Sequence, residues 1–367
     1  MQFGFRANHS TETANCFFLE TVRSVMDKRG VVGAVFLDLK KAFDTISHKV
    51  LLTKLTNFNF SPHALKLMKS YLAGRTQSVR VNGVPSPPLE YDVGVPQGSI
   101  LGPILFSMYI NDLPSVCHDS FIQMYADDTV IYVHAKNKAA AAKKLNKTLV
   151  RVTQWPNNNC LHLNIKKTVC MFFEKQPSKT PDPDVFAAGE RLQIVTEYKY
   201  LGIILDCNLK FKKQIKKVTQ TVKFNLSNFR YIRNCLNIEA ATLYFNAIIM
   251  SHLSYCLTSW SQAHKTTLAP IHSTYKQALK VLDQKPFRHH HCSILAKHDL
   301  LSFDDIIKVM DASLVYKILN GLAPPPLSDF FSRGNRYTRS VAAGNLAIPF
   351  RKSEFGKSAF SVRATHT

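Results

Sequence analysis

The sequence contains no apolar stretch long enough to cross a membrane. Nowhere in the 367 residues is there a run of the roughly eighteen apolar residues that a membrane-spanning helix needs. The first residues also lack the basic region, apolar core and small-residue cleavage site of a signal peptide. We therefore expect a globular protein of the nucleus and cytoplasm that has no membrane partner, and no obligate protein partner is evident.

Paired cysteines are lacking too, although the chain has eight cysteines. No two of them have Cys-x-x-Cys spacing, so a disulfide framework is not indicated and reduced thiols are expected. The run from Arg288 to Cys292 contains three successive histidines. Because adjacent side chains point in different directions on a regular backbone, we do not predict a zinc site there.

Acidic residues are scarce, since 25 Asp and Glu face 47 Lys and Arg and leave a net charge of +22. Uncompensated like charge weakens a compact fold unless an anionic partner neutralises it, and nucleic acid is the obvious partner. Part of the excess lies in one helical stretch, at Lys212, Lys213, Lys216 and Lys217. This pattern fits an ordinary amphipathic helix with a solvated face, but the overall charge favours contacts with phosphates.

The first half of the chain reads as mixed strand and helix. Residues 31–39 form a nearly continuous apolar run, typical of a strand buried on both faces, and Asp38 lies at its end. Strand-like runs at 121–125 and 129–133 flank Asp127 and Asp128, which predicts a hairpin with carboxylates at its tip. Further strand-like runs occupy 77–82 and 89–94, and residues 198–206 read as another hairpin. Helices are predicted at residues 62–74 and 138–152.

After residue 206 the pattern changes to helix only, and we place a domain boundary near there. Helices are predicted at residues 211–235, 239–254, 267–282 and 303–319. The tail from residue 333 onward is basic and weakly patterned, so we expect it to be partly disordered.

Asp38, Asp127 and Asp128 can converge if their three strands neighbour one another in a sheet. Clustered carboxylates repel one another and are tolerated when divalent cations neutralise them; two ions roughly 4 Å apart serve in-line phosphoryl transfer. The alternative is that Asp127 and Asp128 merely form a turn, as Asp often does.

Six motifs in order then resemble the successive motifs of reverse transcriptases of non-LTR (LINE-type, jockey-like) retrotransposons. They are QFGFRANHST (2–11), FLDLKKAFD (36–44), GVPQGSILGP (94–103), YADD (125–128), LNIKKT (163–168) and YLGIILD (200–206). The resemblance extends more loosely to about residue 290. It implies an RNA-directed DNA polymerase that uses an RNA template, a DNA primer and dNTPs, with two Mg²⁺ ions or Mn²⁺ as cofactor.

The resemblance also implies roles for individual residues. Asp38, Asp127 and Asp128 are the expected catalytic and metal-binding carboxylates, and the backbone carbonyl of Leu39 is expected to reach a metal. Lys167 matches a lysine that can protonate pyrophosphate, although Lys166 and a purely solvated role are alternatives.

Other matched positions concern the substrates. Phe43 matches the aromatic residue that packs beneath the incoming sugar, with an ordinary core phenylalanine as the alternative, and Gln97 and Gly98 match the loop that positions the nucleotide. Tyr200, Leu201 and Gly202 belong to the matched primer grip. The lysines at 212, 213, 216 and 217 fall in the matched thumb.

The expected fold is α+β, a right-hand polymerase with truncated fingers, an antiparallel palm and a helical thumb. The expected parts are fingers at 1–35, palm at 36–206, thumb at 207–290, and a helical and basic tail at 291–367. Relatives carry an endonuclease domain and further finger strands before the first motif, and the triphosphate contacts of those strands are expected to be missing unless Arg6 or a lysine substitutes. Pro156 is expected to interrupt a helix that continues in relatives.

Two other functions fit the same motifs. A truncated or domesticated copy would bind nucleic acid with little polymerase activity, but loss of a carboxylate would be its mark and all three are present. A maturase related to group II introns is the second, and residues 198–206 with the following helices favour the retrotransposon type.

Overall fold

The computed structural model describes residues 1–176, 180–333 and 346–365. Contacts divide the chain into two compact units. Unit 1 comprises Met1–Ala7, Val31–Phe172 and Lys179–Val195, and unit 2 comprises Asn8–Gly30, Phe173–Ser178 and Thr196–Thr367. No described helix is both long enough and apolar enough to cross a bilayer. The α+β class is confirmed, whereas the predicted division into fingers, palm and thumb stays a prediction.

Unit 1 is built on a five-stranded sheet with the order β11-β8-β1-β7-β6. β1 is Val31–Leu37, and every one of its residues is buried, as the apolar run predicted. β7 (Asp128–Ala135) pairs antiparallel with β1 and with β6 (Phe121–Tyr125). The edge strand β11 (Gln193–Ile194) runs parallel to β8 (Val169–Phe173), so the sheet is mixed rather than purely antiparallel.

Among the described residues, the other elements of unit 1 are five helices and six two-residue strands. Its helices are α2 (His48–Asn57), α3 (Pro62–Leu72), α4 (Leu101–Tyr109), η1 (Leu113–Val116) and α5 (Lys138–Asn158). Its remaining strands are β2 (Thr76–Gln77), β3 (Arg80–Val81), β4 (Val84–Pro85), β5 (Leu89–Glu90), β9 (Phe186–Ala187) and β10 (Glu190–Arg191). The predicted start of α3 is confirmed, because Ser61 caps its N-terminus and Pro62 opens it.

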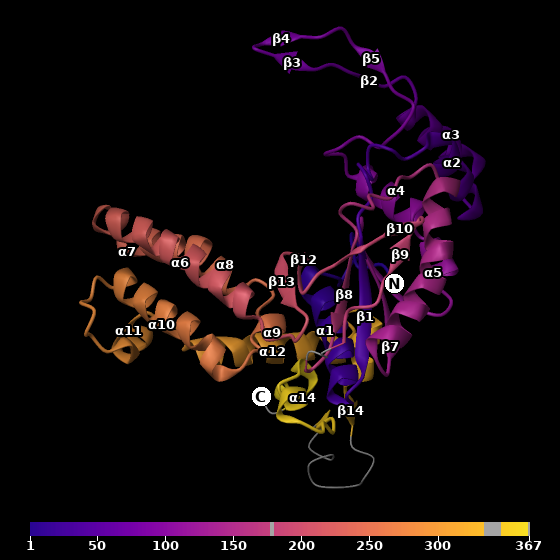
Figure 1. Ribbon diagram of the computed structural model, residues 1–367. Helices are drawn as coiled ribbons and strands as arrows, with labels where there is room; N and C mark the ends of the chain where they lie inside the picture. Colours follow the sequence, from indigo (N-terminus) through magenta and orange to yellow (C-terminus); the bar gives the residue numbers. More distant parts are fainter. Residues whose placement is uncertain (177–179, 334–345, 366–367) are drawn as a thin grey trace. The chain divides into compact units, whose positions relative to one another are not determined.

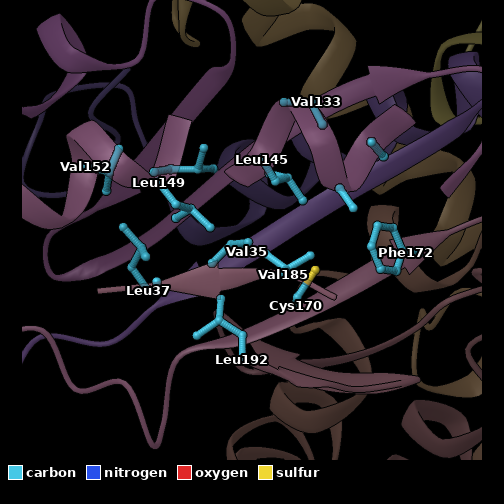
Figure 2. Close-up of a cluster of buried hydrophobic side chains, with 14 of the residues drawn as sticks. Val35, Leu37, Val133, Leu145, Leu149, Val152, Cys170, Phe172, Val185 and Leu192 are labelled. Carbon is cyan, nitrogen blue, oxygen red and sulfur yellow. The ribbon is translucent and has the colours of Figure 1, made fainter. Parts of the chain in front are cut away.

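A hydrophobic core between the sheet and α5 fixes β1 in place. Figure 2 shows Val35 and Leu37 of β1 lying among Leu145, Leu149 and Val152 of α5. Burying a side chain of this size contributes about 1.5–3 kcal/mol, so α5 and β1 are strongly coupled. This core holds the strand that ends at Asp38.

The expectation that Pro156 interrupts a helix is wrong. α5 continues through Pro156 and ends at Asn158. Proline lacks the backbone N–H that would bond four residues back, but Pro156 lies in the last turn and is buried beside Trp155. Packing of Trp155 and Pro156 therefore allows the helix to continue to Asn158.

The predicted strand-like runs at 77–82 and 89–94 form parts of one long two-stranded ribbon. β2 pairs with β5 and β3 with β4, and Figure 1 shows this ribbon projecting beyond α2 and α3. All eight strand residues are exposed. The hydrogen bonds between its paired strands, rather than burial in a core, therefore hold the ribbon together.

Unit 2 is mainly helical after one hairpin, as predicted. β12 (Glu197–Tyr200) and β13 (Ile203–Asp206) pair antiparallel, which confirms the hairpin. The long helices α6 (Lys212–Ile232) and α10 (Lys265–Leu282) run side by side (Figure 1). α12 (Phe303–Leu319) matches its predicted bounds. The other elements are α1 (Thr11–Asp27), η2 (Arg233–Cys235), α7 (Ile238–Tyr244), the π-helix η3 (Phe245–Met250), α8 (Ser251–Ser254), α9 (Leu257–Trp260), α11 (His291–Lys297), η4 (Pro325–Phe330), β14 (Ser332–Arg333), β15 (Leu346–Ala347), α14 (Glu354–Lys357) and α15 (Phe360–Arg363).

The predicted partly disordered tail lies partly outside the described residues, and its described part is anchored. Arg351 forms an ion pair with the buried Glu20 of α1, and Arg363 forms one with the buried Asp311 of α12. Asp27 at the end of α1 accepts hydrogen bonds from the backbone of residues 352 and 353. Polar contacts with both helices therefore order residues 351–363 within unit 2.

Candidate active site

The sheet of unit 1 brings the predicted carboxylates to one end of adjacent strands. β1 and β7 are in register with Leu37 opposite Thr129, so Asp38 and Asp128 follow at the same end of the pair. β6 and β7 join through the two residues Ala126 and Asp127, as predicted for the hairpin tip. Two neighbouring strand ends therefore supply all three carboxylates.

Asp38 is oriented by the segment that follows α5. The Asn164 side-chain amide donates to Asp38 Oδ2 at 2.8 Å, and the Asn164 backbone N–H donates to the Asp38 carbonyl at 2.8 Å. The Asp38 backbone N–H donates to Thr168 Oγ1 at 3.2 Å. The motif at 163–168 thus acts as a clamp on Asp38, which sequence reasoning did not assign to it.

Asp127 is the electrostatically strained member of the set. Restricted hydration of its carboxyl group raises the pKa of Asp127, and the negative charge of Asp38 raises it further, against hydrogen bonds from local backbone N–H groups. The contribution of the Asp38 charge agrees with the strand register, which places the two residues at neighbouring strand ends. A divalent cation would remove this strain.

The donor chemistry of these residues fits a hard cation. Carboxylate oxygens are the ligands that Mg²⁺ prefers, and Asp38 and Asp127 form an acidic pair whose charge no described lysine or arginine neutralises by an ion pair. The three aspartates do not form a close trio among the described residues. Asp38 and Asp127 therefore form the core of the site, and the joint convergence of all three side chains stays a prediction.

The predicted backbone ligand has a suitable orientation. Leu39 forms an isolated antiparallel bridge with Leu163, and the flanking bonds are made by Asp38 and Lys40. In an antiparallel pair, a residue between two such hydrogen bonds turns its own N–H and C=O groups away from the partner strand. The carbonyl of Leu39 therefore points away from residues 162–164. The predicted proton donor Lys167 and its competitor Lys166 are both exposed on the turn after Asn164.

The loop at 94–98 docks on the residues that follow β1. The backbone N–H of Val95 donates to the Phe43 carbonyl at 3.0 Å, and Gln97 Nε2 donates to Asp44 Oδ1 at 2.7 Å. Gly94 has a φ of +83°, and a Cβ there would lie 2.8 Å from the carbonyl oxygen of Asp44, so only glycine permits this approach. The structure therefore brings Phe43 and Gln97 together.

Phe43 is half-buried and stacks on Phe106 of α4, with ring centroids 4.3 Å apart. This position is compatible with both roles considered for Phe43, a core phenylalanine and a residue beneath the incoming sugar, because one face of the ring packs in the core and part of the ring stays accessible. Gly98 lies in open space, where a ligand could approach the backbone. Arg6 is exposed and donates to the Gln2 carbonyl at 3.4 Å.

The predicted nucleic-acid contacts belong to unit 2. In the hairpin turn Tyr200 and Leu201 are buried, so only Gly202 and the backbone are available to a primer. The Tyr255 hydroxyl donates to the Leu201 carbonyl at 3.0 Å and supports this turn. The four predicted lysines are exposed on α6, and Lys213 forms an ion pair with Glu197 of β12.

The histidine cluster at the N-terminus of α11 is more compact than predicted. Potential ligand atoms of His290, His291 and Cys292 lie within 4.8 Å of one another, so the expectation that these side chains diverge is wrong. Burial first, and then the positive charges of Lys276, His290 and Lys280, lower the pKa of His291. That positive field and the helix N-terminus oppose a bound cation.

Comparison with known proteins identifies a family that matches the part of the chain carrying the three aspartates. The family described as reverse transcriptase (RNA-dependent DNA polymerase) matches residues 1–205, more than half of the chain. The RNA-directed DNA polymerase from mobile element jockey of Drosophila melanogaster is 31% identical over 297 residues, which are 78% of this chain and 32% of that protein. The probable RNA-directed DNA polymerase from transposon BS of the same species is 28% identical, over 78% of this chain and 33% of that protein.

This chain thus spans about a third of the length of those relatives. Among solved structures, apo telomerase from Candida tropicalis aligns with a TM-score of 0.43 at 14% identity, over 82% of this chain and 50% of that chain. The family match covers the strands, the hairpin tip and the loop described above. The chain belongs to the reverse transcriptase (RNA-dependent DNA polymerase) family.

Proposed function

We propose that this chain is the RNA-directed DNA polymerase of a non-LTR retrotransposon. It would extend a DNA primer on an RNA template in the nucleus or cytoplasm, with dNTPs and two Mg²⁺ ions. The observation that carries the proposal is the placement of Asp38 and Asp127 at adjacent strand ends, where a divalent cation would offset their mutual repulsion. Primer extension on poly(rA)/oligo(dT) with Mg²⁺ tests it, compared with an Asp127→Asn variant.

The residues of unit 1 have separable tasks in this mechanism. Asp38, Asp127 and Asp128, with the Leu39 carbonyl, would hold the ions, which supply charge stabilisation at the primer 3′-hydroxyl and at the leaving pyrophosphate. Asn164 keeps the Asp38 carboxylate oriented through its 2.8 Å hydrogen bond. Lys167 would deliver a proton to pyrophosphate, and Arg6 would contact the triphosphate.

Phe43 would select deoxynucleotides. Its ring stacks on Phe106, and the hydrogen bond from the Val95 N–H to the Phe43 carbonyl fixes its backbone, so the ring cannot yield to a 2′-hydroxyl without disturbing the core. Gln97, fixed to Asp44, and the open Gly98 would position the nucleotide above it.

We expect Phe43→Val to raise the incorporation of rGTP relative to dGTP by about tenfold or more, because removing the ring frees space for a 2′-hydroxyl. The ratio of kcat/KM for the two nucleotides measures this. Phe60→Val is the matched control, since Phe60 packs against the same core and should lower stability without changing the ratio. An unchanged ratio in a folded, active Phe43→Val protein would assign Phe43 to the core alone.

α6 of unit 2 would follow the nucleic-acid backbone. Its exposed side aligns Lys213, Lys217, Phe224 and Tyr231 at helical spacing, and Phe224 and Tyr231 are 67% and 89% exposed. Lysines neutralise phosphates, while exposed aromatic rings stack on bases or sugars. This combination favours nucleic acid over a merely solvated lysine face.

We expect the joint substitution of Lys212, Lys213, Lys216 and Lys217 by glutamine to flatten the salt dependence of RNA/DNA duplex binding. Each phosphate contact contributes about 0.9 to the slope of log K against log salt, so the slope should fall by roughly two to four. Fluorescence anisotropy measures this slope at salt concentrations of about 50 to 300 mM, a range around cellular ionic strength. The control replaces the exposed Lys28, Lys317, Lys352 and Lys357; an equal change there would show that only total charge matters.

A second candidate is a copy that binds nucleic acid with little polymerase activity. The net charge of +22 and the basic pocket of about 820 Å³ along α10, which includes Lys265, Lys276 and Lys280, favour binding in either case. Duplex binding without primer extension by the wild-type chain would support this candidate.

A further inference from the structure

The first four residues of the chain form part of the support for the carboxylate turn. Gln2 makes a parallel bridge with Met124, the Phe3 backbone N–H donates to the Met124 carbonyl at 2.7 Å, and the Met124 N–H donates to the Met1 carbonyl at 2.8 Å. Gln2 and Phe3 are buried. Residues 1–3 thus lie along the edge of β6 that does not pair with β7, next to the hairpin that carries Asp127.

The Gln2 side chain reaches from this segment into the turn itself. Its amide oxygen accepts from the Ala126 backbone N–H at 3.1 Å and from the Gly4 backbone N–H at 2.8 Å. Ala126 immediately precedes Asp127 and has a φ of +54°, a left-handed conformation that costs an alanine roughly 1–2 kcal/mol. A turn strained in this way needs bonds from outside the hairpin to persist.

Gly4 completes the support by allowing close approach. A Cβ at this position would lie 2.4 Å from the Ala126 nitrogen and 3.1 Å from the Tyr125 carbonyl carbon. These neighbours are backbone atoms, which cannot rotate away as a flexible side chain would. A side chain at position 4 would therefore displace the turn.

We propose that Gln2 is a positioning residue that holds the turn at Ala126 and thereby aims the Asp127 carboxylate at the divalent ion. The structural part of the proposal rests on the bonds described above, and its kinetic part rests on the proposed polymerase function. Gln2 does not touch substrate, because its buried oxygen is occupied by the two backbone N–H groups.

Within the described part of the chain, only the oxygen of the Gln2 amide makes hydrogen bonds, so substitutions can distinguish a role in hydrogen bonding from a role in packing. Gln2 Nε2 is buried and finds no hydrogen-bond partner among the residues that the structure describes. Gln2→Glu keeps an acceptor oxygen for the two backbone N–H groups but replaces the idle amide donor with a second oxygen and adds a carboxyl group that can ionise, whereas Gln2→Met keeps the length and removes the acceptor. If Gln2 merely fills space, Met should serve as well as Glu.

Three readouts separate positioning from packing. In Gln2→Met we expect exchange of the Ala126 amide hydrogen to accelerate about tenfold, because a buried hydrogen bond is lost. The Mn²⁺ dissociation constant of the protein, followed by electron paramagnetic resonance, should rise roughly tenfold, as for other residues that orient metal ligands. In primer extension kcat should fall about tenfold while the KM for dNTP changes little. Gln2→Glu should restore the Ala126 exchange rate to within about threefold of wild type. Because its added carboxyl group also changes the charge beside Asp127, the Mn²⁺ and kcat readouts are compared between Gln2→Met and the wild type only.

Gln154→Met, at an exposed position of α5, is the matched control and should leave every readout at the wild-type value. Gly4→Ala should reproduce the loss of Mn²⁺ affinity by displacing the turn from the other side. Unchanged Ala126 exchange and Mn²⁺ affinity in a folded Gln2→Met protein would overturn the proposal, as would an equally accelerated Ala126 exchange in the Met and Glu variants. If the exchange and Mn²⁺ results hold but the wild-type chain extends no primer, the positioning role stands and the polymerase function fails.

Discussion

Asp127→Asn should lower kcat for primer extension by roughly a thousandfold, because metal-mediated charge stabilisation of a phosphoryl transition state is worth several kcal/mol. The amide keeps the size of the side chain but lacks the negative charge and one acceptor oxygen. Duplex binding should stay near the wild-type level, since the lysines of α6 are unaltered. Asp119→Asn is the control, because Asp119 is an exposed residue paired with Lys147 on the same unit.

Asp127→Asn should also make the metal-free protein more stable. A variant that gains stability while it loses activity distinguishes loss of a metal ligand from damage to the fold. The raised pKa of Asp127 means that its charged form is disfavoured in the folded state, so charge removal helps at neutral pH. The advantage of the variant should shrink as pH falls, because wild-type Asp127 then takes up its proton. Asp119→Asn should do the reverse, since a hydrogen bond and charge from Lys147 lower the pKa of Asp119.

Calorimetry in the presence of a chelator measures both stabilities. A wild-type level of extension by Asp127→Asn would contradict the polymerase mechanism. A metal-free melting temperature lowered by this substitution would contradict the proposed strain between Asp127 and Asp38.

Arg363→Met should destabilise unit 2 by about 3–5 kcal/mol, because it leaves a buried carboxylate without its partner. Arg363 donates through Nε and Nη2 to the two oxygens of Asp311 at 2.5 and 2.8 Å, and Asp311 is completely buried. Nη2 also donates to the Thr258 carbonyl at 3.2 Å, so the guanidinium joins the tail to two helices.

The pH dependence of this effect follows from the buried carboxyl group. Burial raises the pKa of Asp311, and the Arg363 charge and hydrogen bonds only partly offset it. Without Arg363 the folded-state pKa should rise further, so the native variant binds a proton at a pH where the unfolded chain does not. The stability deficit should therefore be largest at neutral pH and become smaller as pH falls.

Urea unfolding at neutral and mildly acidic pH checks this prediction. The double variant Arg363→Met/Asp311→Leu should recover most of the loss, because it leaves no buried charge. Lys357→Met removes an exposed partner of Glu354 and should cost about 0.5 kcal/mol or less. If Arg363→Met and Lys357→Met are equally mild, the tail contributes no buried ion pair.

Local pattern was sufficient to predict several elements of the fold. The valine-rich run of β1 has enough apolar residues to be buried on both faces, and the flanking runs around Asp127 left only a hairpin tip for the two carboxylates. Ser61 and Pro62 fixed the start of α3, because capping depends on adjacent residues alone. These features rest on neighbours within a few positions along the chain.

Long-range contacts decided the rest. Asn164 meets Asp38 across 126 positions, and Gln2 meets Ala126 across 124 positions. A side-chain amide can bond to any suitable partner, so residue type does not indicate which backbone group it will face. The motifs marked these segments as important, but only strand register and packing gave them partners.

The sequence by itself determined the family and the strands beside which Asp38, Asp127 and Asp128 lie, because these follow from residue types at short spacing. The tertiary structure alone placed residues 8–30 with the C-terminal helices, carried α5 through Pro156 and brought the 94–98 loop onto Phe43. The physical reason is that burial and hydrogen bonding between distant segments outweigh local preferences of about 1–3 kcal/mol per residue, and those partners are chosen only when the whole chain packs.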